Sequence, residues 1–382
     1  MTDGVDMKVI ERAARDVLAR LGGITVDPAA VLPADIPLEL SGEAVRARLC
    51  IFTDASGAER VMRPDLTLPI ADAEAARRVS GQDDPITLQY AARAFRLPVT
   101  RHDPMEFTQI GVERFGYAAS PDADAELFAA ICDAATASGV GIDRIAMGDL
   151  SIFPAFVDAL GLAASTNGLL KRAFRQSGGV RKLLSETSAY ADLALGNELA
   201  ALDANAARQK LLGTLEARGI ELIGARSADE IVASLIAKAD AARVGGVPKE
   251  ARELLEKVLA VSAVPDDAVE ALYVLARGAG LNLVLPHLDT LAARNDAMRK
   301  SVGADIMATA SFLTPFGRRF NYYDGFVFEV FGVGADTRHP LASGGRYDAL
   351  IRDLSLGKVS ATALGGVVRP DRIAKSINGG AA

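Results

Sequence analysis

Residues 94–116 read AFRLPVTRHDPMEFTQIGVERFG, and this stretch carries the main evidence for the fold. Together with the apolar run before it, it predicts two strands joined by a segment that contains prolines. The first strand ends at Arg96, and the second carries Glu106, Gln109 and Glu113 among apolar residues. Polar residues in such a strand indicate either a solvated strand face, which is the commoner cause, or the floor of a small-molecule site.

Helix and strand patterns on both sides of this stretch predict the fold class. Residues 7–21 have the apolar spacing of an amphipathic helix, and residues 49–62 read as strand, D-A-S-G turn and strand. Asp122 is expected to cap the N-terminus of another helix. Residues 304–373 are rich in strand patterns. The expected class is α+β, with an antiparallel sheet flanked by helices.

The middle of the chain has a different composition. Residues 163–279 contain Ala-, Leu- and Glu-rich helical segments with almost no aromatic residues, which predicts an all-helical insertion. Residues 281–300 are expected to return to the core as another strand and helix. The expected organisation is therefore a first core part at 1–162, the insertion, and a second core part at 280–382.

Composition and charge exclude several classes of function. The net charge is −7 and no block is rich in Lys or Arg, whereas a nucleic-acid binder usually presents a basic face. His102, His287 and His339 lack metal-ligand spacing, so no metal is expected. Cys50 and Cys132 form no CxxC motif. No apolar run reaches the ~18 residues of a membrane span, and no signal-peptide core is present. We expect a cytoplasmic protein with no membrane partner.

Four segments, taken in order, resemble the catalytic domain of histidyl-tRNA synthetase, a class II aminoacyl-tRNA synthetase. They are VMRPDLTLPIA (61–71), AFR…EFTQIGVERFG (94–116), RRFNYYDGFVFE (318–329) and SGGRYDAL (343–350). The last two resemble segments peculiar to the histidine enzymes within the class. The resemblance implies a class II synthetase-like antiparallel sheet and covers the helical insertion only weakly.

Several departures from the synthetase pattern predict a loss of adenylate chemistry. Pro98 stands where the family's second motif has the glutamate that reads adenine, and Met105 stands where the family has a further arginine. In the third motif, Val367 and Val368 lie near the position of the phosphate-binding arginine, and Arg369 fits only with a one-residue shift. Few charges would then stabilise adenylate formation. The chain also stops shortly after this motif, so we expect no anticodon-binding domain and no tRNA partner.

The amino-acid pocket of the family, by contrast, is expected to be intact. A free amino acid carries an ammonium and a carboxylate, whose burial requires opposite charges and hydrogen-bond partners. By resemblance, the ammonium of histidine would be held by Asp65, Thr67 and Gln109, and its carboxylate by Arg96 and Arg318. The imidazole would be bound by Glu113 and Tyr323, and Tyr347 would close the wall of the pocket. Asp65 replaces the family's usual glutamate and so shortens the reach by one methylene.

The family includes true synthetases and the synthetase-like regulatory subunits of ATP phosphoribosyltransferase, and the departures favour the second kind. The expected function is non-catalytic and needs no cofactor. The chain would form a homodimer within a hetero-oligomer, together with the short-form catalytic subunit, and would transmit feedback by L-histidine on the first step of histidine biosynthesis. The inhibitor would bind in the pocket or at the interface with the catalytic chain. Two alternatives stay open: a truncated ligase that forms an aminoacyl-adenylate, and a stand-alone amino-acid sensor.

Overall fold

The computed structural model describes residues 6–41, 43–100, 103–176, 178–185, 193–220, 227–243, 247–316, 322–334 and 339–379. The chain forms two compact units, one of residues 1–151, 261–273 and 286–382, the other of residues 152–260 and 274–285. The second unit overlaps the insertion expected at 163–279 without sharing its ends, so the domain boundaries drawn from the sequence remain predictions. Arg318 and His102 lie outside the described residues.

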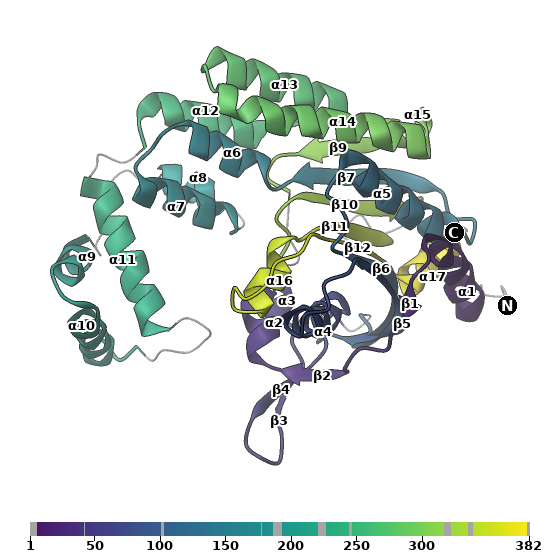
Figure 1. Cartoon of the computed structure of the whole chain (residues 1–382), viewed down its shortest axis with the longest axis horizontal. Helices are drawn as coiled ribbons and strands as arrows, with labels where there is room; N and C mark the ends of the chain where they lie inside the picture. The colour runs from purple at the N-terminus through teal and green to yellow at the C-terminus, as the bar shows by residue number, and fades with distance from the viewer. Residues whose placement is uncertain are drawn as a thin grey trace. The chain divides into compact units, whose positions relative to one another are not determined.

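The first unit is built on a nine-stranded sheet in the order β1-β5-β6-β12-β11-β10-β7-β9-β8 (Figure 1). Only β1 with β5 and β7 with β9 pair in parallel, so the expected antiparallel core is confirmed. The two strands predicted around residues 94–116 are β5 and β6, paired from Ile86–Phe115 to Phe95–Glu106. The strands of this sheet are β1 Ile24–Thr25, β5 Ile86–Phe95, β6 Glu106–Phe115, β7 Ile142–Asp149, β8 Ser262–Ala263, β9 Ala310–Leu313, β10 Phe326–Gly332, β11 Ala342–Arg346 and β12 Ala363–Val368.

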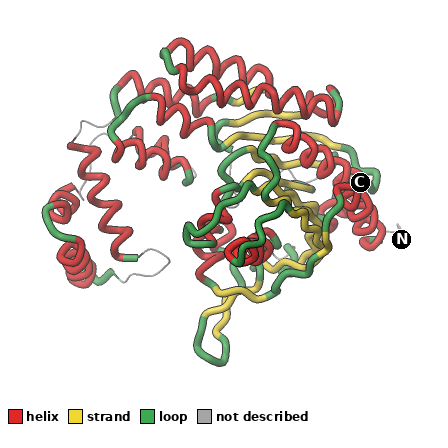
Figure 2. Tube along the Cα trace, in the orientation of Figure 1, coloured by secondary structure: helices red, strands yellow, loops and turns green. Residues whose placement is uncertain are grey.

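Helices cover both faces of this sheet (Figure 2). A Cβ atom added at Gly366 of β12 would point toward Ile131 of α5. A Cβ atom added at the preceding residue, Gly365, would point to the opposite face, toward Glu113 and Tyr347. The helices α1 Met7–Leu18, α5 Pro121–Thr136 and α17 Pro370–Gly379 pack together on the α5 side. On the other side α4 Thr67–Val79 packs against α16 Ala349–Leu354, and both contribute to one apolar cluster with β5 and β6.

A small second sheet precedes α4. It has the order β2-β4-β3 and consists of β2 Val31–Pro33, β3 Ile51–Thr53 and β4 Glu59–Met62, so the predicted strand, turn and strand are found. The remaining helices of this unit are η1 Ala19–Leu21, α2 Asp35–Leu40, α3 Glu43–Arg46, α14 Leu285–Val302 and α15 Ala304–Ala308.

Buried ion pairs tie α14 to the sheet. Arg294 donates to Asp124 at 2.7 Å and to Asp149 at 2.6 Å, and Arg346 also donates to Asp124. All four side chains are buried. Burial raises the pKa of Asp149, but the charge of Arg294 and the hydrogen bonds from Ser151 and Arg294 together outweigh burial and leave that pKa lowered. The cluster therefore holds two carboxylates and two guanidinium groups that neutralise one another.

The second unit is helical throughout its described residues, whereas the insertion expected at 163–279 also contains the short strand β8 Ser262–Ala263 and is therefore not all-helical. A small apolar cluster around Leu199, Leu211 and Val232 holds three of its helices together. Its helices are α6 Ile152–Ala159, α7 Ala164–Phe174, α8 Gly179–Ser185, α9 Leu193–Ala200, α10 Ala204–Ala217, α11 Ala228–Arg243, α12 Lys249–Ala260 and η2 Asn282–Val284, and α13 Pro265–Gly278 spans both units.

Two local expectations are wrong. No strand forms within residues 281–300, where η2 leads directly into α14. Pro286 lies in the first turn of α14, a position where the missing N–H of proline costs nothing. The cap of α5 is Ser120 rather than Asp122, because the Ser120 hydroxyl accepts from the backbone N–H of Ala123 and Pro121 begins the helix.

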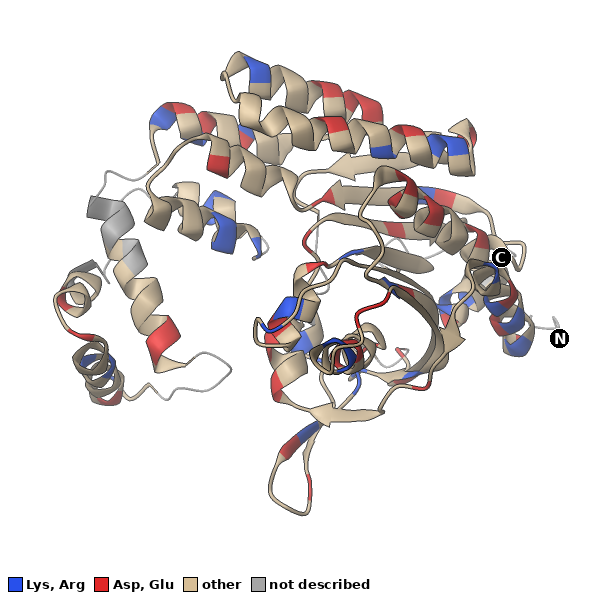
Figure 3. Ribbon diagram, in the orientation of Figure 1, with Lys and Arg blue, Asp and Glu red and all other residues tan. Residues whose placement is uncertain are grey.

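The charged surface is mixed in sign. Lys and Arg are interspersed with Asp and Glu along α12, α13 and α14 (Figure 3). Such mixing is typical of solvated helices rather than of a face that binds a polyanion. Among the helices of the described residues, none is both long enough and apolar enough to cross a membrane.

Candidate functional site

One face of β6 forms the floor of the site. Successive side chains of a strand alternate between faces, so Phe107, Gln109 and Glu113 point to the same side. All three are buried, and Gln109 and Glu113 are only 4% and 1% exposed. The solvated-face interpretation is therefore wrong for these two residues. It holds for Glu106, which is exposed and lies 3.5 Å from Arg93.

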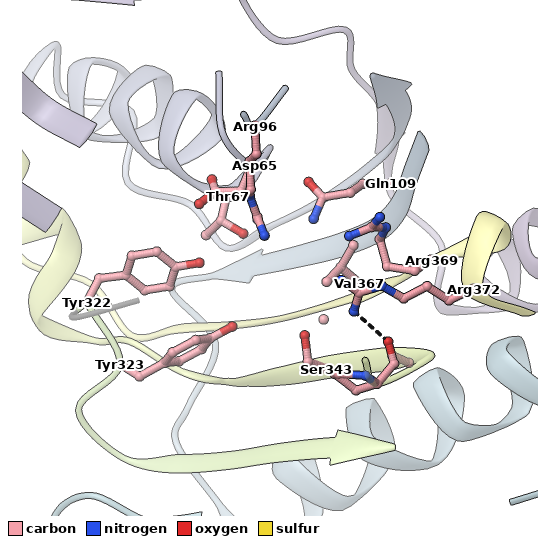
Figure 4. A pocket seen from close by; sticks show the side chains of 13 residues that line it. Asp65, Thr67, Arg96, Gln109, Tyr322, Tyr323, Ser343, Val367, Arg369 and Arg372 are labelled. Carbon is pink, nitrogen blue, oxygen red and sulfur yellow. Dashed lines mark hydrogen bonds between the residues drawn. The ribbon is translucent and has the colours of Figure 1, made fainter. Parts of the chain in front are cut away.

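A pocket opens above this floor (Figure 4). Its empty space, which includes the open solvent at its mouth, amounts to about 530 Å³. Five of the predicted site residues line it, from the β4–α4 junction, β5–β6 and the start of β10. The lining residues are Asp65, Thr67, Arg96, Gln109, Tyr322, Tyr323, Pro340, Ala342, Ser343, Gly366, Val367, Arg369 and Arg372.

Two buried acceptors, Asp65 and Gln109, line the pocket. Asp65 precedes α4, and its Oδ1 accepts from the backbone N–H of Leu68, which fixes the side chain at the start of the helix. Asp65 Oδ2 and Gln109 Oε1 are buried and have no hydrogen-bond partner among the described residues. Burial raises the pKa of Asp65 to about 6. Two unpartnered acceptors of this kind favour a ligand that donates hydrogen bonds and carries positive charge.

Glu113 lies behind the pocket wall and is not among the lining residues. Its carboxylate accepts from the hydroxyls of Thr67 at 2.7 Å, Tyr90 at 3.1 Å and Tyr347. Burial raises the pKa of Glu113 to about 7, although these three hydroxyls act in the opposite direction. Gly365 makes the arrangement possible, because a Cβ there would lie 1.6 Å from Glu113 Oε2. Thr67 connects this carboxylate to the pocket surface.

Three tyrosines form an aromatic wall. The ring centroids of Tyr322 and Tyr323 are 4.7 Å apart, and that of Tyr347 lies 5.6 Å and 6.0 Å from them. Tyr322 and Tyr323 line the pocket, and their hydroxyls point into it (Figure 4). Burial raises the pKa of all three phenols, so they are neutral hydrogen-bonding groups at physiological pH.

Three guanidinium groups also line the pocket, and that of Arg96 lies beside Asp65 (Figure 4). Arg96 donates from Nε to the carbonyl of Pro64 at 2.8 Å. Arg369 and Arg372 come from the start of α17, and Arg372 donates to the carbonyl of Pro340 at 2.8 Å (Figure 4). The pocket thus combines two buried acceptors with three guanidinium groups, and groups of both kinds suit a zwitterion.

The structure brings together most of the predicted site. Asp65, Thr67, Arg96, Gln109 and Tyr323 line the pocket, Glu113 and Tyr347 lie directly behind it, and Arg318 is outside the described residues. Sequence reasoning did not assign Tyr322, Arg369 or Arg372 to the amino-acid site. The doublet Tyr322-Tyr323 is a sequence signal that points to Tyr322. The R-P-D-R sequence at the start of a helix is the signal that points to Arg369 and Arg372.

Two of the departures from the synthetase pattern lie outside this pocket, whereas Asp65, Val367 and Arg369 line it. Pro98 and Met105 belong to the exposed loop between β5 and β6, and neither is a lining residue. They leave the amino-acid floor unchanged.

Comparison with known proteins identifies a family. A family model described as Histidyl-tRNA synthetase matches residues 5–244 and 215–373. A curated ATP phosphoribosyltransferase regulatory subunit from Mesorhizobium japonicum is 32% identical over 365 residues, 91% of this chain and 92% of that protein. One from a Chelativorans species is 30% identical over 347 residues, 88% of this chain and 89% of that protein.

Solved structures show the same fold. A protein from Bacillus halodurans, described as an ATP phosphoribosyltransferase regulatory subunit/histidyl-tRNA synthetase, aligns with a TM-score of 0.61 at 20% identity, over 99% of this chain and 82% of that chain. A histidyl-tRNA synthetase from a Nostoc species aligns with a TM-score of 0.58 at 16% identity, over 96% of this chain and 70% of that one.

Proposed function

This chain belongs to the histidyl-tRNA synthetase family, and from the names of its relatives we propose that it is the non-catalytic regulatory subunit of an ATP phosphoribosyltransferase, acting in histidine biosynthesis. The observation that carries the proposal is its likeness, over about nine-tenths of both chains, to curated subunits of that name. The partner is a catalytic ATP phosphoribosyltransferase chain, which the regulatory subunit activates and makes sensitive to histidine.

The ligand that we assign to the pocket is L-histidine. Its ammonium would lie between Asp65 and Gln109, where two buried acceptors have no partner, and its carboxylate would face Arg96. Thr67 would also face the ammonium, with Glu113 orienting its hydroxyl from behind, and Tyr323 would meet the imidazole. Regulation then is a coupling free energy between this pocket and the active site of the partner, typically ~1–3 kcal/mol.

A homodimer is the assembly that we infer for the regulatory chain. Strand β3 lies at the edge of its small sheet, and Ile51 and Phe52 on it are 44% and 42% exposed. Leu97 and Met105, also exposed, belong to the neighbouring loop. An edge strand can pair antiparallel with its own copy about a two-fold axis, which gives a self-complementary contact. Light scattering on Phe52→Glu should show a monomer; an unchanged mass would place the contact elsewhere.

The proposed function is tested with the isolated chain and with the assembled complex. Calorimetric titration with L-histidine and, separately, with ATP should show binding of the amino acid alone. Added to the catalytic subunit, the chain should raise its rate and make it sensitive to histidine. If the catalytic subunit is fully active alone and the chain changes neither property, the proposal fails. Histidine-dependent pyrophosphate exchange with ATP would favour the ligase instead.

A further inference from the structure

Phe107 lies next to two of the arginines of the pocket without lining the pocket itself. Its ring centroid is 5.2 Å from the guanidinium carbon of Arg96 and 3.6 Å from that of Arg369. Phe107 is 4% exposed and is two residues from Gln109 on β6, so its ring is on the same side of the strand as the pocket floor. The face of a phenyl ring attracts cations, and this ring therefore stabilises both guanidinium groups.

Each of the two arginines has a second restraint. Arg96 Nε donates to the carbonyl of Pro64 at 2.8 Å. Arg369 donates from Nε and Nη2 to the two carboxylate oxygens of Asp371, both at 2.9 Å. A guanidinium held between an aromatic ring and a fixed acceptor keeps one orientation, so little side-chain freedom is lost when it meets an anion.

We propose that Phe107 is a positioning residue which, together with Asp371, holds Arg96 and Arg369 as a pair for the carboxylate of the ligand. The pair then makes the pocket selective for amino acids over analogues that lack the carboxylate. Phe107 acts through the arginines, since it is not itself a lining residue. This inference rests on the proposed function, because it takes an amino acid as the ligand of the pocket.

The test is a pair of calorimetric titrations on the full chain. L-Histidine and L-histidinol share the ammonium and the imidazole, but histidinol has a hydroxymethyl group in place of the carboxylate. In the wild-type chain the affinity for histidine should exceed that for histidinol. In Phe107→Leu this ratio should fall by roughly tenfold while the affinity for histidinol stays the same. Phe107→Tyr keeps the ring face and should keep the ratio.

A second variant guards against loss of folding in Phe107→Leu. Asp371→Asn leaves the ring in place but weakens the other restraint on Arg369, and it should lower the ratio in the same direction. Equal weakening of both ligands in the variants would indicate a packing role and overturn the inference, as would an unchanged ratio in both. A wild-type chain that does not distinguish the two ligands would also overturn it, whereas histidine inhibition of the assembled complex tests the proposed function separately.

Discussion

Two groups of buried polar side chains lie in the first unit, and they differ in whether other groups of the protein satisfy their charges and hydrogen bonds. In the cluster of Asp124, Asp149, Arg294 and Arg346, each charge meets an opposite charge within the protein. At the pocket, Asp65 Oδ2 and Gln109 Oε1 have no partner among the described residues. Both groups are equally shielded from water, so burial alone does not distinguish structure from function.

The difference lies in hydrogen-bond completion. A fully paired ionic cluster has nothing left to offer a ligand, and breaking it only destabilises the fold. A buried acceptor without a partner costs free energy until a donor arrives, and a ligand that supplies the donor recovers that cost as affinity. The first cluster should therefore affect stability when it is changed, and the second should affect binding.

The largest effect is expected from the closed cluster. Arg294→Met removes the cation shared by Asp124 and Asp149 and leaves two buried carboxylates short of a partner. The free energy of unfolding should fall by about 3–5 kcal/mol, measured by urea denaturation. The matched control is Arg299→Met on the same helix, whose ion pairs with Asp266 and Asp296 are at the surface and contribute at most about 1 kcal/mol. Equal losses of unfolding free energy in the two variants would contradict the distinction between the buried cluster and the surface ion pairs.

The pH dependence of stability comes next in size. Burial raises the pKa of Glu113 from its ordinary 4.5 to about 7, so between these values the folded chain holds a proton that the unfolded chain has lost. This contribution to stability is full below about pH 4.5 and disappears as the pH rises through 7, a change of up to roughly 3 kcal/mol. Glu113→Gln should flatten the decline between pH 5 and pH 8 in urea denaturation. A variant that declines as steeply as the wild type would contradict the raised pKa.

A smaller effect, confined to binding, is expected at Asp65. Asp65→Asn removes the charge that would meet the ligand's ammonium, so the affinity for L-histidine at pH 7.5 should fall about 10- to 100-fold. Stability should stay the same or rise, because a neutral amide replaces a buried carboxylate with an unpartnered oxygen. Asp72→Asn, on α4 and outside the pocket lining, is the control for titration calorimetry. A destabilised Asp65→Asn with normal affinity would assign Asp65 to the fold alone.

The smallest effect is expected at Tyr347. Tyr347→Phe deletes one of the three hydroxyls that donate to Glu113 and should cost about 1 kcal/mol of stability. Because Tyr347 does not line the pocket, histidine affinity should change less than in Asp65→Asn. A loss of affinity larger than that of Asp65→Asn would place the phenol in direct contact with the ligand.

Local sequence patterns were sufficient to predict one strand pair in each of the two sheets. The β5–β6 pair follows from apolar runs around a loop with prolines, and the β3–β4 hairpin from its D-A-S-G turn. The strand expected within residues 281–300 is absent because a short apolar run has no period that separates a strand from a buried helix, whereas Pro286 suits the first turn of a helix.

The site was harder to predict because its contacts are not local. Glu113 is satisfied by hydroxyls 46, 23 and 234 residues away in sequence, so its burial behind the wall could not be inferred from its own strand. Arg372 donates a hydrogen bond to the carbonyl of Pro340, which lies 32 residues earlier in the sequence. Residue types identified the chemistry of the pocket, and only the fold shows which groups remain unpaired.

The register between β6 and β12 should produce covariation between two paired positions in related sequences. Gly365 is the register partner of Glu113, and any larger residue there would collide with that carboxylate. The two positions should therefore vary together in evolution. Lineages that keep glutamate at 113 should keep glycine at 365, and lineages that lose both the glutamate and the hydroxyl of Tyr347, which would lie 2.9 Å from the added Cβ, should be free to accept alanine or serine. This pair of positions would then show which relatives have kept the carboxylate, without a structure of each.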